Sequence, residues 1–227
     1  MCRLICLLFV SCSLFIQTGV CASREKASSH FFLGMNSGVD FASGSNTISS
    51  PTGSSTPYHK HYDINSTKVA LGINFGGMIA VSDQVSIGQE ISFNPLGGAQ
   101  VVKGDASSGG PFDDTGIGYG LIMATLNYYP KTLPVFFFSK LGTAYSFSNG
   151  TFLGSTIDNN QSFSGPAVAL GFGKSIGSFS FTMSYQYIRF NNYNYDCWGG
   201  LFNSTKYPGV YNGSINSLIL AAYWNFG

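Results

Sequence analysis

The sequence predicts an all-β fold: an eight-stranded antiparallel up-and-down barrel whose strands span a membrane. Three observations predict it. Charged residues make up only 9% of the 227-residue chain, whereas a soluble domain carries about a quarter. Apolar residues recur at every second position in eight segments, which is the period of a strand. The connections between these segments are alternately long and short, so the two ends of such a barrel differ.

The first 22 residues are expected to be a signal peptide that is removed on export. Arg3 supplies a positive charge, and an apolar run follows from Leu4 to Ile16, which is the usual pattern. The run is too short to span a bilayer, because about 20 apolar residues are needed. Acylation of Cys21 would instead make a lipoprotein, but the residues before it fit that signal poorly. We therefore expect one barrel domain over residues 23–227.

The composition of the rest of the chain excludes several classes of protein. No apolar run there reaches the length of a transmembrane helix, and a barrel is the other structure that pairs every backbone amide inside hydrocarbon. The net charge of +1 argues against a nucleic-acid partner. Cys197 is the only cysteine after the signal peptide, so it is either inert or a bridge to a second chain.

The first three strands are expected over residues 30–41, 68–81 and 85–94. The polar stretch 42–67 between the first two is rich in Ser, Gly, Asn and Thr, and it is expected to be a surface loop. On the third strand Gln89 breaks the alternation, since it falls on the face that otherwise carries Val and Ile.

The fourth strand, over residues 117–129, is ambiguous because both of its faces are apolar. A bulge partway along would reconcile the two possible phases. The last four strands are expected at 135–147, 165–174, from Phe179 onward, and at 214–227, with a long loop over 191–213. By these boundaries the connections are about 26, 3, 20, 5, 16, 4 and 23 residues long.

The closing strand places one apolar face toward lipid, formed by Leu218, Leu220, Trp224 and Phe226. Aromatic residues near its end suit a membrane interface. This strand resembles the closing strand of bacterial outer-membrane barrels, which ends on an aromatic residue and serves as their assembly signal. Here Phe226 is penultimate, before Gly227. The resemblance implies that the barrel-assembly machinery is a partner.

The chain from residue 23 onward resembles the OmpA-type or opacity-protein-type eight-stranded outer-membrane barrels. The stretch Gly120–Gly142, GLIMATLNYYPKTLPVFFFSKLG, is similar to that family's strand, Tyr-Pro turn, strand unit. The resemblance implies the outer membrane of a Gram-negative bacterium, with its lipid and lipopolysaccharide as partners. It also implies a non-enzymatic role in envelope structure, adhesion or surface recognition. A narrow or gated channel and a lipid A-modifying enzyme are the alternatives.

The barrel interior is expected to be small and polar, mainly Gly, Ala, Ser, Thr, Asn and Lys. A soluble lipocalin-like barrel needs the opposite polarity, with an apolar cavity inside. Glu90 and Lys140 both point inward, about five residues above turns at the same end, so strand rise places them at similar depth. We predict a lumenal ion pair that helps plug the barrel; two separately solvated charges are the alternative.

Aromatic residues gather in the last predicted loop, which should face outward. Such side chains give large contact areas at little entropic cost, so they are candidates for contact with host surface molecules. The alternative is an interfacial aromatic girdle. The candidates are Tyr193, Tyr195, Trp198, Phe202 and Tyr207, with Tyr211 beside them.

No catalytic residue, cofactor or metal site is expected. The histidines are His30, near the start, and His59 and His61, in the first predicted loop. A catalytic base must lie within hydrogen-bond reach of its nucleophile, which a loop residue seldom achieves. His59 and His61 flank a lysine, and no carboxylate or cysteine spacing around them indicates a metal site.

Overall fold

The computed structural model describes residues 25–49, 59–102, 115–148, 164–198 and 206–227, which form one closed barrel. Every strand pairs antiparallel with the next, and β8 pairs with β1. The predicted fold class is therefore confirmed. The strands are β1 (His30–Ser49), β2 (His59–Ser82), β3 (Val85–Val102), β4 (Thr115–Tyr128), β5 (Phe136–Ser148), β6 (Ser164–Ile176), β7 (Phe179–Trp198) and β8 (Lys206–Phe226).

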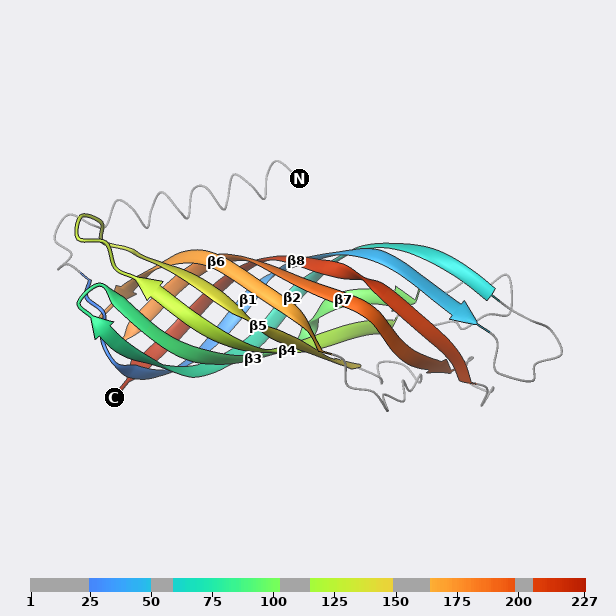
Figure 1. Cartoon of the computed structure of the whole chain (residues 1–227), viewed down its shortest axis with the longest axis horizontal. Coiled ribbons are helices and arrows are strands. Elements are labelled where there is room, and N and C mark those ends of the chain that lie inside the picture. Colours follow the sequence, from blue (N-terminus) through green and yellow to red (C-terminus); the bar gives the residue numbers. More distant parts are fainter. Residues whose placement is uncertain (1–24, 50–58, 103–114, 149–163, 199–205) are drawn as a thin grey trace.

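The short connections meet at one end of the barrel, which we call the turn end. They are residues 83–84, 129–135 and 177–178, and the first described residues and the C-terminus lie at this end too (Figure 1). Gly177 has a φ of 61°, a left-handed conformation that two-residue hairpin turns favour. We call the opposite end the loop end. In the part of the chain that the structure describes, we find no helix long and apolar enough to cross a membrane.

Several strands extend farther toward the loop end than predicted. Most of the predicted loops 42–67 and 191–213 belongs to β1, β2, β7 and β8, whose backbones stay paired there; the extensions are visible in Figure 1. The prediction of long irregular loops at these positions was wrong. A polar sequence marks the part of a strand that lies in water, and backbone pairing continues there without an apolar face.

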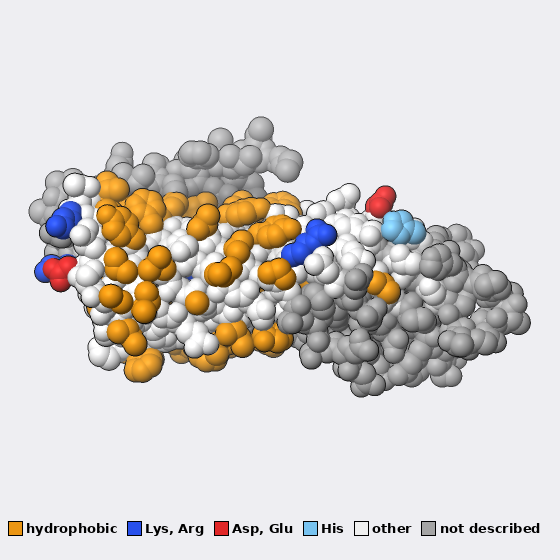
Figure 2. Space-filling model, viewed as in Figure 1, with side chains coloured by type: hydrophobic (Ala, Val, Ile, Leu, Met, Phe, Trp, Pro, Cys, Tyr) orange, Lys and Arg blue, Asp and Glu red, His pale blue; other side chains and the backbone are white. Residues whose placement is uncertain are grey.

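The outer surface of the barrel is apolar, as predicted. Leu71 is 42% exposed and Phe75 48%, while Leu220 and Trp224 on β8 are 47% and 51% exposed. Figure 2 shows hydrophobic side chains covering the barrel toward the turn end, with charged side chains near both edges of this region. The closing strand also exposes Leu218 and Phe226. An apolar exterior around a closed sheet is the polarity of a barrel solvated by lipid.

The two faces of β4 are both apolar for different reasons. Ile122 and Leu126 are exposed on the outside, whereas Leu121 and Met123 are buried in the lumen. β4 pairs with β5 without any shift of register, so the predicted bulge in the fourth strand was wrong. The irregularity lies in β3 instead, between Asn94 and Ala99.

The lumen is more apolar than predicted. Toward the loop end it holds a packed cluster of mostly large apolar side chains in place of small polar ones. A closed eight-stranded barrel has room for side chains only, and close packing of apolar groups excludes water from it. The cluster includes Tyr119, Leu121, Met123, Ile188, Phe190, Tyr211 and Ile215.

Candidate functional site

Glu90 on β3 and Lys140 on β5 meet inside the lumen. Lys140 Nζ lies 2.8 Å from Glu90 Oε1 and 2.7 Å from Glu90 Oε2, and the two side chains are only 12% and 8% exposed, respectively. The alternating strand period turns both inward, and β4 between them contributes Thr125, the cross-strand partner of Lys140. The pair is thus a charge-assisted contact shielded from water.

Hydrogen bonds extend this pair across the lumen; we call the connected residues the Glu90–Lys140 network. Tyr223 on β8 donates to Glu90 Oε2 at 3.3 Å and accepts from Lys140 at 3.4 Å. Asn74 on β2 donates to the Tyr223 hydroxyl at 3.2 Å, and Asn36 on β1 donates to Asn74 at 2.5 Å. Five strands therefore contribute to one polar layer across the barrel.

A second set of contacts, besides the Glu90–Lys140 network, lies at the turn end, where residues 25–29 cross the mouth of the lumen. Glu25 Oε1 accepts a 2.6 Å hydrogen bond from the backbone N–H of Ser175, at the end of β6. Lys26 lies 3.1 Å from the Asp83 carboxylate in the turn between β2 and β3, and Ala27 N–H donates to the Asp83 carbonyl. We call this segment the N-terminal strap. Ala27 packs there against Tyr129, Phe136 and Phe138.

The strap was not predicted, because it has no alternating pattern. Its contacts join β6 to the turn after β2, which lie on opposite sides of the barrel. Burial raises the pKa of the Glu25 carboxyl, while the Ser175 N–H and the charge of Lys174 act in the opposite direction. The strap therefore covers the mouth at the cost of partly burying a carboxyl group.

A third layer lies nearer the loop end around Asp40, a fully buried carboxylate on β1. The Gly98 N–H donates to Asp40 Oδ2 at 2.6 Å, and the Tyr119 hydroxyl donates to Oδ1 at 3.3 Å. Gln186 in turn donates to the Tyr119 hydroxyl. Gly98 adopts a φ of 103° within the β3 irregularity, which brings its N–H to the carboxylate. The alternation of β1 turns Asp40 inward, but no sequence signal indicates its partners.

The aromatic contact candidates do not lie in a loop as predicted. Tyr193, Tyr195 and Trp198 are on the end of β7, and Tyr207 is on the start of β8. The backbones pair there, with Cys197 opposite Tyr207. The side chains of these five residues, and the whole of Phe202, lie outside the described part of the structure.

The histidines also differ from prediction, since His59 and His61 belong to β2. His61 Nδ1 lies 3.2 Å from Thr47 Oγ1, and Nε2 lies 3.9 Å from Asp63 Oδ1. The latter distance is too long for a hydrogen bond, and the His61 and Asp63 side chains are 60% and 90% exposed. A catalytic imidazole is usually oriented by a hydrogen-bonded third group, often a carboxylate, and the His61–Asp63 contact is too long for that. No group of three metal-ligating residues occurs in the described ranges.

An apolar exterior, a closed eight-stranded sheet and unlike ends define a transmembrane barrel of the outer-membrane class. Among solved structures, the fold is similar to that of the outer membrane protein AlkL, with a TM-score of 0.50, 16% identity and coverage of 91% of this chain and 94% of that chain. Neisserial surface protein A gives a TM-score of 0.48 at 12% identity, covering 88% of this chain and 100% of that chain.

The outer membrane protease OmpT from Escherichia coli gives a TM-score of 0.40 at 10% identity, covering 90% of this chain and 100% of that chain. No family model matches the sequence, and no curated protein matches it. At such identities, likeness to solved structures shows a shared fold alone. The role of this chain has to be argued from its own residues.

Proposed function

We propose that this chain is a non-catalytic surface protein of the bacterial outer membrane, with a closed lumen and with strand ends that meet the environment. Filling of the lumen at three successive levels carries the proposal. The N-terminal strap crosses the turn end, the Glu90–Lys140 network spans the middle, and Asp40 with the apolar cluster occupies the part toward the loop end. An open channel needs a continuous water path, which each of these layers interrupts.

The Glu90–Lys140 pair acts as a plug in this proposal. Its charges are buried and matched, so opening the lumen at this level requires separating them inside a medium of low dielectric constant. Planar bilayers containing the purified protein test this directly. We expect no lasting single-channel currents from the wild type. Steady currents would overturn the closed-lumen proposal and support a gated channel instead.

The strand ends at the loop end, beyond the apolar part of the outer surface, form the proposed display surface. In barrels of this class the short turns face the periplasm and the opposite end faces outward, so the ends of β7 and β8 that carry Tyr193, Tyr195, Trp198 and Tyr207 belong to the outward-facing end. Host surface molecules are the proposed partners of this end. Outer-membrane lipid and lipopolysaccharide are the proposed partners of the apolar outer surface. The barrel-assembly machinery is the proposed partner of the closing strand, β8.

Whole-cell binding to host surfaces tests the display surface. Tyr195→Ser combined with Trp198→Ser is expected to reduce binding by about thirtyfold or more, because an aromatic anchor typically carries about 2 kcal/mol or more of an interface. Lys131→Ser, in an exposed turn at the opposite end, is the control and should leave binding unchanged. Equal binding by all three cell types would favour an aromatic girdle at the lipid interface. Surface labelling must show equal amounts of barrel.

A further inference from the structure

One amide side chain on the outer face of the barrel is surrounded by apolar side chains. Gln89 on β3 is exposed, and its neighbours on the same face of the strand are Ile87 and Ile91. Its cross-strand partners are Gly77 on β2 and Ala124 on β4. The residues diagonal to it are also apolar and exposed: Phe75, Ile79, Ile122 and Leu126.

The Gln89 amide has no hydrogen-bond partner among the described residues. Asn216 shows how an outward amide is otherwise accommodated, because its Oδ1 accepts a hydrogen bond from the Tyr185 hydroxyl beside it. An unpaired amide in hydrocarbon is costly, since acyl chains neither donate nor accept. The position of Gln89 therefore calls for a polar partner beyond the described residues.

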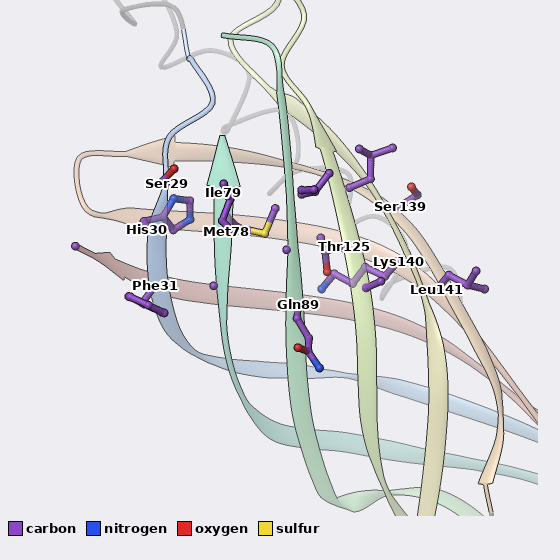
Figure 3. A pocket seen from close by; sticks show the side chains of 16 residues that line it. Ser29, His30, Phe31, Met78, Ile79, Gln89, Thr125, Ser139, Lys140 and Leu141 are labelled. Carbon is purple, nitrogen blue, oxygen red and sulfur yellow. The ribbon is translucent and has the colours of Figure 1, made fainter. Parts of the chain in front are cut away.

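The surface around Gln89 is hollowed. Figure 3 shows the residues of this groove, with Gln89 projecting from β3 between strands on either side. The groove has a volume of about 940 Å³ and is bordered by apolar side chains such as Ile79 and Leu141. Gly77 and Ala124, the small cross-strand neighbours of Gln89, both line it. Small residues allow another membrane segment to approach the backbone closely.

We propose that this face joins two copies of the chain in the membrane, with their Gln89 amides hydrogen-bonded to each other across a two-fold axis. An amide both donates through Nε2 and accepts through Oε1, so two identical amides related by two-fold symmetry each donate one hydrogen bond to the other and accept one from it. The ester group of a lipid only accepts, and it would leave Oε1 unpaired. A second copy is thus the partner that fits both halves of the amide.

Disulfide crosslinking in phospholipid vesicles tests the location of the interface. Residues 23–227 carry Cys197→Ser, to exclude that thiol, together with Ala124→Cys, the cross-strand neighbour of Gln89 on β4, so that the amide itself is kept. We expect oxidation to give a covalent dimer on a non-reducing gel. Leu170→Cys, on the outer face of β6 and 64% exposed, is the matched control and should stay monomeric. Equal crosslinking of both variants, or of neither, would overturn the proposal.

The strength of association tests the role of the amide. Single-molecule photobleaching at increasing dilution in lipid should show wild-type dimers, and Gln89→Leu should weaken the dimer about 5- to 30-fold, the loss expected for one or two hydrogen bonds between membrane segments. Ser139→Ala, also within the groove, serves as control. A monomeric wild type, including one that retains bound lipid, overturns the proposal. A change in electrophoretic mobility on boiling confirms that each variant is folded.

Discussion

Lys140 Nζ lies 2.7 Å from Glu90 Oε2, although the two residues are on strands that do not pair with each other. The contact exists because β4 separates β3 and β5 on a strongly curved wall, so two inward side chains converge on the barrel axis. Tyr223 completes the arrangement by contacting both charges. This relationship decides how the lumen responds to mutation.

Removing one charge of this pair should be costly. Lys140→Met leaves the Glu90 carboxylate buried without its cation, and we expect the free energy of unfolding to fall by about 3–5 kcal/mol. Urea titration of the protein in lipid vesicles, followed by tryptophan fluorescence, measures it. The double variant Glu90→Gln/Lys140→Met should lose less than the two single variants added together, because no charge is then stranded.

An exposed ion pair provides the matched control. Lys26 and Asp83 are 60% and 71% exposed, so Asp83→Asn should change the free energy of unfolding by no more than about 1 kcal/mol. A large loss at Asp83 together with a small loss at Lys140 would contradict the importance that we assign to the lumenal pair.

The Tyr119 hydroxyl should stabilise the layer nearer the loop end. Tyr119→Phe removes the donor to Asp40 and the acceptor of Gln186, so buried polar atoms lose their partner and the free energy of unfolding should fall by about 1–3 kcal/mol. The same urea titration measures the loss. Tyr145→Phe is the control, because Tyr145 is exposed on the outer face. Equal losses from both variants would show that the Asp40 contacts contribute nothing.

A charged side chain on the apolar outer surface should destabilise the barrel. Leu220 is on the outer face of β8, so Leu220→Arg should destabilise folding into lipid vesicles by about 2–4 kcal/mol if the residue lies near the bilayer midplane. Leu220→Ala separates the loss of apolar area from the cost of the charge. Folding yield and free energy in vesicles are the measurements. A tolerated arginine there would contradict the assignment of this face to lipid.

The sequence by itself determined the number of strands, the place of the short turns and, on every strand that has one apolar and one polar face, the direction of the side chains. These features are local, because a strand alternates with a period of two wherever it is solvated differently on its two faces. The alternation therefore predicts Glu90 and Lys140 inward, and Leu218, Leu220, Trp224 and Phe226 outward. The polar strand ends were missed because in water both faces are polar and the alternation disappears.

Only the tertiary structure decided which inward side chains meet. Contact across the lumen depends on strand register and on closure of β8 against β1. The register of every strand pair contributes to this closure, so the sequence of a single strand does not reveal it. Three contacts were decided in this way: the hydrogen bonds of Tyr223 to both charges, the Gly98 contact with Asp40, and the contacts of the N-terminal strap across the mouth of the lumen. The apolar lumen near Met123 does too, since a strand with two apolar faces does not reveal which one meets lipid.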